Sequence, residues 1–194
     1  MNSTKNFLDV GCGSGLYVHA AQLMGLDAYG IDVDEKSISI AREQGLKVEK
    51  TDIFQANFKH GYFDLIQMKQ VLEHIPDPKE CLSRVRSLLK LNGVLMIDVP
   101  NQSGIIPKIK ITFKIRKNEY GFVQPPMHLF AYTQRSLRGI LERVGFEVIW
   151  MGQSWPGDPV FCPIIKQNLI YESIFWKSNT LKMGSILVAY AKKT

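Results

Sequence analysis

The chain of 194 residues has a length that suits one domain with a sizeable hydrophobic core, and its hydrophobic content of 45% and charged content of 22% are ordinary for a globular protein. The net charge of +6 and the isoelectric point near 9.2 favour acidic partners such as phosphorylated substrates, anionic lipid surfaces or nucleic acid, although a basic enzyme without an anionic partner fits equally well. Because the three distant cysteines form no Cys-x-x-Cys pair and no apolar run approaches about 18 residues, the sequence excludes a disulfide framework, a zinc knuckle and a membrane-spanning helix.

The first predicted elements are a strand, a glycine turn and a helix. Residues 7–15 read Phe-Leu-Asp-Val-Gly-Cys-Gly-Ser-Gly, and a helical pattern follows from Leu16 to Met24. Glycine lets the backbone turn tightly and removes the side chain that would hold a ligand away from the main chain. The helix N-terminus behind the turn offers free N–H groups and the positive end of a dipole. The pattern predicts a nucleotide-binding crossover, with a generic tight turn of an α/β fold as the alternative.

Two acids stand at the ends of the next two predicted strands. Residues 27–32 form a strand that ends in Asp32, about 20 residues beyond the glycines, which is the distance at which a carboxylate recognises ribose. One carboxylate can accept hydrogen bonds from both vicinal hydroxyls of a ribose. Asp52, with Ile53 beside it, follows a short strand at residues 46–50. A carboxylate there can bind the exocyclic amine of a base, or it is a loop aspartate with buried neighbours.

The pattern continues to alternate strands and helices as far as residue 100. Asp34 is placed to cap a helix that ends at Gly45, and residues 62–68 form a fourth strand. A helix with one apolar face follows, and Asn92-Gly93 makes a turn into a nearly continuous apolar strand at residues 94–99, which is typical of a buried parallel position. This alternation predicts βαβ units with right-handed crossovers and a mainly parallel sheet.

The regular pattern is interrupted at residues 101–127. Within the interruption, residues 107–117 interleave basic and apolar side chains, which predicts either a basic amphipathic surface for an acidic substrate or a membrane, or a solvated edge hairpin protected by lysines. Thr133 is then placed to cap a helix that Gly145 ends. Strands at residues 146–151 and 184–192 follow, and such a pair after the fifth strand predicts an antiparallel edge of the sheet.

These motifs together resemble the class I S-adenosylmethionine-dependent methyltransferases, in the broad group that includes the ubiquinone-biosynthesis O-methyltransferases. The motifs are Leu-Asp-Val-Gly-Cys-Gly-Ser-Gly at 8–15, Gly-Ile-Asp at 30–32, Val-Leu-Glu-His-Ile-Pro-Asp at 71–77, Leu-Asn-Gly-Val-Leu at 91–95, and His-Leu-Phe at 128–130 followed by Gly-Phe-Glu-Val at 145–148. The resemblance implies an α/β, Rossmann-like sheet of seven mostly parallel strands with order 3-2-1-4-5-7-6, strand 7 antiparallel and helices on both faces. It also implies a single domain over residues 1–194, with a substrate-side insertion at about 101–127.

The resemblance implies S-adenosylmethionine as the cofactor. Gly11 and Gly13 would line its methionine part. Asp9 would support the amino group, directly or through water, and the carbonyl oxygen of Met68 would accept a hydrogen bond from the same group.

The nucleoside part of the cofactor has its own expected partners. Asp32 would hold both ribose hydroxyls, and Asp52 would hold the adenine amine with Ile53 beside the ring. The whole expected cofactor-binding set is Asp9, Gly11, Cys12, Gly13, Asp32, Val33, Asp52, Ile53 and Met68.

Two features depart from the family's pattern. Family members carry N-terminal helices that cover the cofactor, whereas six residues precede the first predicted strand here, so we expect a partner subunit or the insertion to cover the site, or the site to be open. Some quinone O-methyltransferase relatives resemble a metal-binding Glu-x-x-Glu-His, and Gln70 stands at the first of these acids, ahead of Glu73 and His74. Without that carboxylate we predict no metal.

An acceptor hydroxyl or amine must lose a proton when it is methylated, so a nearby general base would help. Histidine titrates near neutral pH, and the candidates are His74 after the fourth strand and His128 after the insertion. The alternative for His74 is a structural, packed side chain. Tyr120 and Tyr132 are further candidates for orienting the substrate.

The predicted activity is methyl transfer to a quinone-, lipid- or sugar-like small molecule, with a hydroxyl oxygen favoured over nitrogen or carbon. A methyltransferase-like domain that binds the cofactor or a partner without turnover is the alternative. Leu16 stands where a nicotinamide dehydrogenase needs the third glycine of Gly-x-Gly-x-x-Gly, and no Asn-Pro-Pro-Tyr-like motif of nucleic-acid methyltransferases follows the fourth strand. We expect a cytoplasmic protein, with peripheral membrane contact through residues 107–117 and a homo-oligomer left open.

Overall fold

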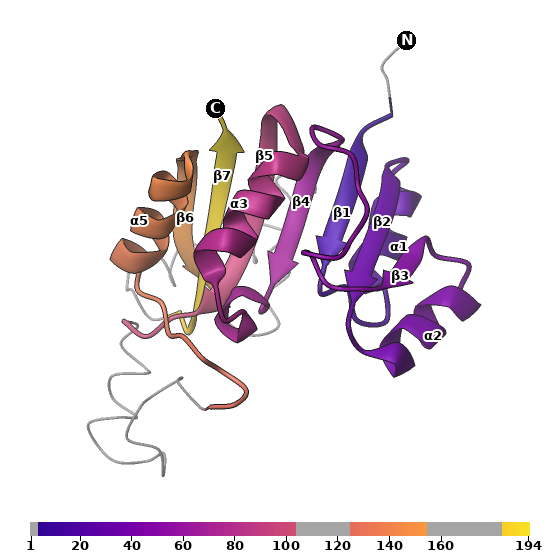
Figure 1. Cartoon of the computed structure of the whole chain (residues 1–194), viewed down its shortest axis with the longest axis horizontal. Coiled ribbons are helices and arrows are strands. Elements are labelled where there is room, and N and C mark those ends of the chain that lie inside the picture. The colour runs from indigo at the N-terminus through magenta and orange to yellow at the C-terminus, as the bar shows by residue number, and fades with distance from the viewer. Residues whose placement is uncertain (1–3, 104–124, 155–183) are drawn as a thin grey trace, which may run out of the picture.

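The computed structural model describes residues 4–103, 125–154 and 184–194 of the chain. Over these residues the strands form one seven-stranded sheet in the order β3-β2-β1-β4-β5-β7-β6, which can be followed across Figure 1. This order is the predicted one. The strands are β1 (Asn6–Val10), β2 (Asp27–Asp32), β3 (Val48–Lys50), β4 (Phe63–Lys69), β5 (Leu89–Pro100), β6 (Phe146–Ser154) and β7 (Ile186–Lys193).

The strand directions place the carboxyl ends of β1 and β4 side by side. β1 pairs in parallel with β2 and with β4, β2 pairs in parallel with β3, and β4 pairs in parallel with β5. β7 runs antiparallel to both β5 and β6, which confirms the predicted antiparallel edge. The chain leaves β1 toward β2 and β3 and returns to β4 on the other side of β1. Such a switch in direction is where open α/β sheets bind their ligands.

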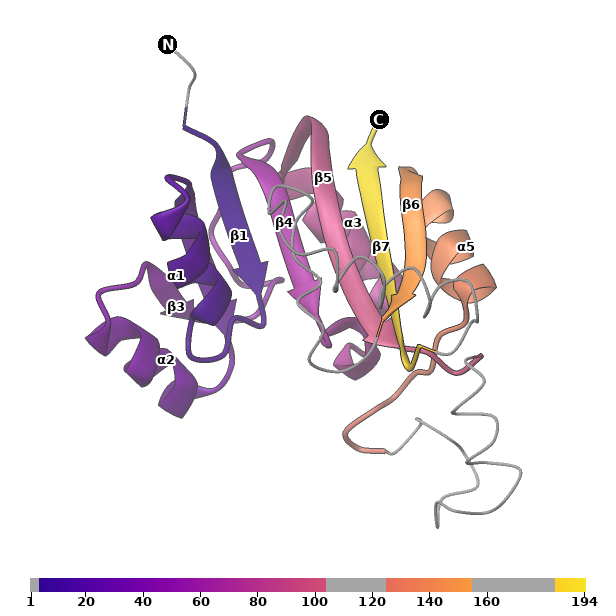
Figure 2. The ribbon, with the colours of Figure 1, turned by 180° about the vertical axis from the view of Figure 1, so that it is seen from behind.

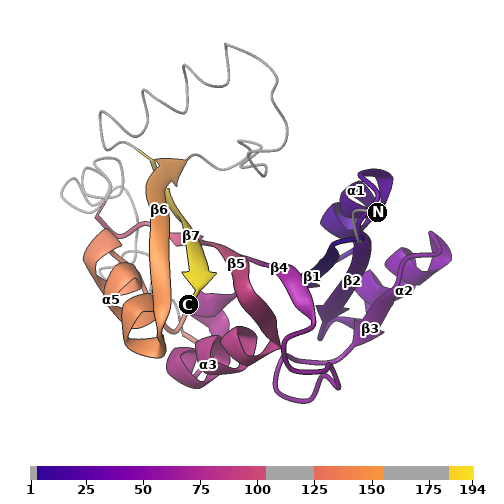
Figure 3. The same ribbon diagram turned by 90° about the horizontal axis from the view of Figure 1, so that it is seen from above.

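Helices cover both faces of the sheet, as predicted. α1 and α2 pack with β1 and β2 in one apolar cluster that includes Val18 and Ile38, whereas α3 and α5 contribute Val85 and Leu141 to the larger cluster on the other face. Figure 3 shows α1 on the opposite face from α3 and α5, and Figure 2 brings α1 to the front beside β1. The helices are α1 (Leu16–Leu23), α2 (Glu35–Glu43), α3 (Pro78–Leu88) and α5 (Gln134–Val144), with a short 3₁₀ helix, η1 (Leu72–His74).

Short polar side chains fix where the helices begin. Asp34 accepts a 3.0 Å hydrogen bond from the N–H of Ser37 at the start of α2, and Thr133 accepts a 3.1 Å bond from the N–H of Ser136 at the start of α5. Each bond satisfies an N–H group that has no partner within its helix. Both predicted caps are therefore confirmed. Because α2 starts directly after β2, its N-terminus lies at the carboxyl edge of the sheet.

β5 begins five residues earlier than the predicted strand, at Leu89 rather than residue 94. Leu89 pairs with Phe63, and the next regular pair is Val94 with Leu65, so residues 90–93 leave the register of the ladder. Asn92 has a φ of +63°, a left-handed conformation that asparagine tolerates better than most residues. The predicted Asn92-Gly93 turn therefore lies inside β5 instead of ahead of it.

Most of the predicted insertion lies outside the described residues. The structure describes residues 101–103 and 125–127 of it, so the basic stretch at residues 107–117 lies outside them. In the part of the chain that is described, no helix has the length and apolar character needed to cross a bilayer.

Candidate functional site

The glycine turn after β1 is tied to the end of β2. Gly11 donates its N–H to the carbonyl oxygen of Ile31 at 2.8 Å. One carboxylate oxygen of Asp32 accepts from the N–H of Gly13 at 2.8 Å, and the other accepts from the N–H of Asp34 at 2.9 Å. Since a carboxylate has about four lone-pair positions, about two remain for ribose hydroxyls. The structure thus brings the predicted turn and the predicted acid into contact.

The main chain is bare at one glycine of the turn. A Cβ added to Gly13, where φ is +52°, would meet nothing within 4 Å. A Cβ added to Gly11 would lie only 2.4 Å from Cγ2 of Val71, so this glycine allows the segment after β4 to pack closely against the turn. The open space over Gly13, next to the carboxylate of Asp32, is a cradle that fits the expected cofactor.

Asp9 is a buried acid one residue before the end of β1. Its side chain is 1% exposed, and its Oδ1 accepts a 3.1 Å hydrogen bond from Nε2 of Gln67 on β4. Its Oδ2 is buried without a hydrogen-bond partner among the described residues. Burial raises the pKa of this carboxyl to about 7, although the bond from Gln67 and the positive charge of Lys69 pull it down. A buried oxygen without a partner is suited to an ammonium group of a ligand.

The residues expected around the base occupy different environments. Oδ1 of Asp52 accepts from the N–H groups of Phe54 and Gln55 at 2.8 and 2.9 Å, so this carboxylate also holds the loop after β3. Ile53 is 2% exposed and belongs to the main core, whereas Val33 is 68% exposed beside the end of β2. The loop role that the sequence left open for Asp52 is therefore present, and one of its oxygens is not used by these two bonds.

Met68 and Cys12 place their side chains in the core. Met68 is fully buried in β4 within the larger apolar cluster. Cys12 packs into the α1–α2 cluster, and burial raises the pKa of its thiol to about 12. A thiol with so high a pKa is not a nucleophile at neutral pH.

A polar network at the carboxyl ends of β4 and β5 was not predicted. Nζ of Lys69 donates a 2.7 Å hydrogen bond to the hydroxyl of Tyr17 in α1 and lies 3.5 Å from Oδ2 of Asp98. Oδ1 of Asp98 accepts from both the N–H and the side-chain amide of Gln70, at 2.9 and 2.8 Å. Burial works to lower the pKa of Lys69, but the bond to Tyr17 and the charge of Asp98 outweigh it and raise the pKa above its usual value.

A sequence signal for this network was available. Gln67, Lys69 and Asp98 are polar residues among apolar neighbours in the carboxyl-terminal halves of β4 and β5, and burial of a polar group requires a partner. Burial raises the pKa of Asp98, and the bonds from Gln70 and the nearby ammonium of Lys69 oppose that shift. Polar residues near the ends of predicted strands therefore indicated a polar network at the carboxyl edge of the sheet.

The two predicted histidines lie together, next to a buried acid. The rings of His74 and His128 have centroids 4.9 Å apart at an interplanar angle of 65°, and Nδ1 of His74 is hydrogen-bonded to the carbonyl oxygen of Met127. Glu73 is fully buried, and neither carboxylate oxygen has a hydrogen-bond partner among the described residues. Burial raises the pKa of Glu73 to about 7, against the opposing charge of His128. This acid was not among the predicted catalytic residues.

The same three side chains also form a candidate donor set for a metal ion. One ligand atom from each of Glu73, His74 and His128 lies within 4.8 Å of the others. Carboxylate and imidazole ligands suit several divalent metals. The hydroxyl of the nearby Tyr132 is buried without a hydrogen-bond partner among the described residues, and burial together with the charge of Glu73 raises its pKa. Tyr120 lies outside the described residues.

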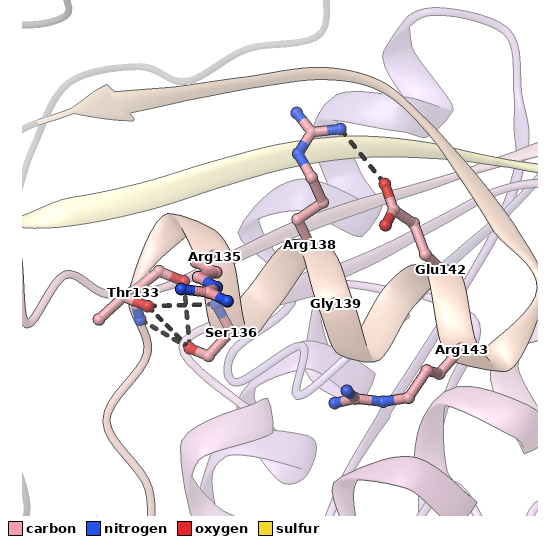
Figure 4. Close-up of a pocket in the computed structure, with 7 residues that line it drawn as sticks. All are labelled: Thr133, Arg135, Ser136, Arg138, Gly139, Glu142 and Arg143. Carbon is pink, nitrogen blue, oxygen red and sulfur yellow. Dashed lines mark hydrogen bonds and ion pairs between the residues drawn. The ribbon is translucent and has the colours of Figure 1, made fainter.

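A surface hollow on α5 is separate from these residues. Figure 4 shows it along one side of the helix, where Arg138 pairs with Glu142 at 3.5 Å and Thr133 bonds with Ser136 at the helix start. None of the candidate cofactor or base residues lines it. The lining residues are Thr133, Arg135, Ser136, Arg138, Gly139, Glu142 and Arg143.

The chain is similar to known methyltransferases. A family profile described as a methyltransferase domain matches residues 1–150. Among curated proteins, a ubiquinone biosynthesis O-methyltransferase of Bordetella avium is 35% identical over 106 residues, which cover 51% of this chain and 44% of that protein. The chain spans about half the length of the curated relatives it matches.

Solved structures share the fold. A S-adenosylmethionine-dependent methyltransferase from Archaeoglobus fulgidus superposes with a TM-score of 0.69 at 22% identity, covering 98% of this chain and 87% of that one. The [4+2]-cyclase SpnF superposes with a TM-score of 0.66 at 18% identity, covering 100% of this chain and 76% of that one. The fold is therefore shared by proteins that are named for different reactions, and the reaction must be argued from the site.

Proposed function

This chain belongs to the class I S-adenosylmethionine-dependent methyltransferases, whose domain profile covers residues 1–150, and on that premise we propose that it methylates a hydroxyl oxygen of a small molecule. The curated relatives that it matches over about half their length are named O-methyltransferases. That name supports oxygen as the acceptor atom. A quinone-, lipid- or sugar-like acceptor remains the substrate class of this proposal.

The observation that carries the proposal is the arrangement of Asp32 and Gly13. The carboxylate of Asp32 is held at the end of β2 by two backbone N–H groups, and the main chain at Gly13 lies bare beside it. A ribose can bind the remaining lone pairs of Asp32 while the rest of the molecule lies against the glycine turn. In the same proposal Asp52, Ile53 and Val33 surround the base.

The methionine part of the cofactor belongs at the switch point between β1 and β4. Asp9 presents a buried oxygen without a partner there, among the described residues, and Gly11 and the backbones of Cys12 and Met68 border the same edge. When bound, S-adenosylmethionine supplies an electrophilic methyl group on its sulfonium sulfur. The protein's main tasks are then to align the acceptor oxygen for in-line attack and to exclude water.

We assign the general base to His128, which lies beside the buried carboxyl group of Glu73. A carboxylate oxygen of Glu73 lies within 4.8 Å of a ring nitrogen of each histidine, and the charge of His128 opposes the rise in the pKa of Glu73 that burial causes. His128 takes the hydroxyl proton of the acceptor as the new carbon–oxygen bond forms and the carbon–sulfur bond breaks. His74, whose Nδ1 is bonded to the carbonyl of Met127, is assigned to holding the segment that carries His128.

The test of cofactor binding is calorimetric titration with S-adenosylhomocysteine and, separately, with NAD, each repeated on Asp32→Ala. We expect micromolar binding of S-adenosylhomocysteine that is lost in the variant, with no signal for NAD. Binding of NAD would contradict the proposal. Binding of S-adenosylhomocysteine without turnover of any phenolic, lipid or sugar hydroxyl would favour a non-catalytic cofactor-binding domain.

The remaining parts of the proposal concern the chain as a whole. We propose one methyltransferase domain over residues 1–194, with the acceptor recognised by the insertion at about 101–127. A cytoplasmic location, membrane contact through residues 107–117 and a homo-oligomer stay predictions. The absence of a bound metal also remains a prediction. The candidate donor set of Glu73, His74 and His128 gives a reason to test it.

A further inference from the structure

Lys69 links β4 to α1, the helix that follows the glycine turn. It is the last residue of β4, and Tyr17, whose hydroxyl accepts its hydrogen bond, lies in the first turn of α1 directly behind the glycines. The ammonium also lies 4.7 Å from the centre of the Tyr17 ring, a cation–π distance. The Lys69–Tyr17 contact therefore borders the methionine end of the proposed cofactor site.

Asp9 and Lys69 present opposite charges on the same face of the sheet. Asp9 is the register partner of Gln67, and Lys69 follows Gln67 by two residues, so the three side chains project to one side. Two residues along a strand span about 7 Å, and the flexible four-carbon stem of lysine can shorten that gap. Asp9 has a buried oxygen without a partner among the described residues, and Lys69 keeps 21% of its side chain exposed.

We propose that Lys69, supported by Tyr17, binds the carboxylate of the cofactor's methionine part, while Asp9 receives the ammonium group. The site would then recognise the amino-acid zwitterion by a matched pair of opposite charges. This inference rests on the proposed function, because it requires S-adenosylmethionine to be the cofactor. It adds a binding residue that the sequence comparison had not suggested.

The alternative is that Lys69 serves only to neutralise the buried Asp98. Two observations favour a further partner for the lysine. Oδ1 of Asp98 already accepts two hydrogen bonds from Gln70, and the 3.5 Å separation between Nζ and Oδ2 is longer than a charged hydrogen bond. The ammonium has three N–H donors, and the bond to Tyr17 occupies one of them.

The experiment compares ligands with and without the carboxylate. Binding of S-adenosylhomocysteine and of 5′-methylthioadenosine, which lacks the amino-acid end, is measured by calorimetry on the wild type and on Lys69→Met. We expect Lys69→Met to weaken S-adenosylhomocysteine about 10- to 100-fold, as loss of a charge-assisted hydrogen bond would, and to change 5′-methylthioadenosine less than about twofold. Decarboxylated S-adenosylmethionine, which keeps the ammonium, should be as insensitive to the variant as 5′-methylthioadenosine.

Lys90→Met is the matched control. Lys90 also pairs with an aspartate, Asp64 at 2.7 Å, but at the opposite edge of the sheet, so its removal should leave both affinities unchanged. If Lys69→Met does not fold, Lys69→Arg and Tyr17→Phe replace it. The arginine keeps the charge and should retain most of the affinity, whereas Tyr17→Phe should weaken S-adenosylhomocysteine alone, about threefold or more.

The outcomes separate this inference from the proposed function. If the wild type binds S-adenosylhomocysteine, the proposed function stands. If Lys69→Met then changes the affinities for S-adenosylhomocysteine and 5′-methylthioadenosine equally, or changes neither, the role of Lys69 is overturned. If Lys69→Met does not fold, Tyr17→Phe is used instead. Equal changes in the two affinities in Tyr17→Phe, or no change in either, would likewise overturn the role of Lys69. Wild-type protein that binds none of these ligands refutes the proposed function, and this inference with it.

Discussion

Gln67 donates a 3.1 Å hydrogen bond from Nε2 to Oδ1 of Asp9 across the β1–β4 pair, and this is the bond that holds the buried acid in place. The other oxygen of Asp9 has no hydrogen-bond partner among the described residues. A single neutral donor does not compensate a buried carboxylate, so the pKa of Asp9 rises from 3.8 to about 7. The first prediction follows from that shift.

Asp9 should make the protein less stable as the pH rises from about 4 to about 7. In this window the folded state holds a proton on Asp9 that the unfolded chain has released, so raising the pH favours unfolding. Above pH 7 both states are ionised and the effect is constant, at up to about 4 kcal/mol. Asp9→Asn should therefore be more stable than the wild type at pH 8, with the difference nearly gone at pH 4, as measured by urea unfolding.

The same acid should make cofactor binding depend on pH. The ionised form of Asp9 attracts the ammonium of S-adenosylhomocysteine, so wild-type affinity should rise between pH 6 and pH 8 while that of Asp9→Asn stays flat. A parallel rise in wild type and variant would assign the dependence to another group.

Asp32→Asn should abolish tight binding of S-adenosylhomocysteine. The amide can accept through one oxygen only, so it cannot serve both backbone N–H groups and two ribose hydroxyls. We expect at least a 100-fold loss, corresponding to about 3 kcal/mol, in calorimetry. Asp34→Ala is the control. It removes the cap of α2 and should lower Tm while leaving the affinity unchanged. An Asp32→Asn variant with wild-type affinity would contradict ribose recognition.

Gly13→Ala should mainly weaken cofactor binding, whereas Gly11→Ala should mainly lower the stability of the fold. At Gly13 the new methyl group meets nothing in the protein, so the free energy of unfolding should fall only by the backbone strain of a positive φ, about 1–2 kcal/mol. The methyl group would occupy the space proposed for the cofactor, so the affinity for S-adenosylhomocysteine should drop sharply. At Gly11 the methyl group meets Cγ2 of Val71 at 2.4 Å, so stability should fall further. Thermal unfolding and calorimetry of each variant separate the two effects.

The Gly11 clash can be tested on its own. Adding Val71→Ala to Gly11→Ala should recover part of the lost Tm, because it removes the side chain that the new methyl group meets. No recovery would mean that the positive φ alone accounts for the loss.

His128→Asn should lower turnover about 100-fold or more once an acceptor is known, with the affinity for S-adenosylhomocysteine within about twofold of the wild type. Glu73→Gln should also lower turnover, since it removes the buried titratable group that lies beside both histidines. His74→Asn should have a smaller effect, because its Nδ1 is engaged with Met127. A larger loss in His74→Asn than in His128→Asn would transfer the role of base to His74.

Removal of divalent cations tests whether Glu73, His74 and His128 bind a metal ion. Activity that is unchanged after dialysis against EDTA would agree with proton transfer by His128 and with the prediction of no metal. Activity that is lost and then regained with Mg²⁺ or Zn²⁺ would instead assign Glu73, His74 and His128 to a metal.

Much of the fold could be predicted from local patterns. The glycine turn, the caps at Asp34 and Thr133 and the alternation of apolar runs depend on nearest neighbours along the chain, and they indicated a mainly parallel sheet with an antiparallel edge. The order of the strands was implied by the family resemblance and is the one observed. The start of β5 could not be predicted in this way. Leu89 joins the strand because it pairs with Phe63, 26 residues earlier, and the positive φ of Asn92 absorbs the mismatch in register.

The sequence by itself determined which chemical groups stand at the carboxyl ends of the strands, because the acid of Asp32 and the glycines before it follow from spacing along the chain. Only the tertiary structure decided which groups meet. Lys69 reaches Tyr17 and Asp98 across three elements, and Glu73 meets His128 from 55 residues away. Burial, which shifts the pKa values of Asp9 and Glu73, is likewise a property of the packed chain. It depends on neighbours that converge only when the sheet forms.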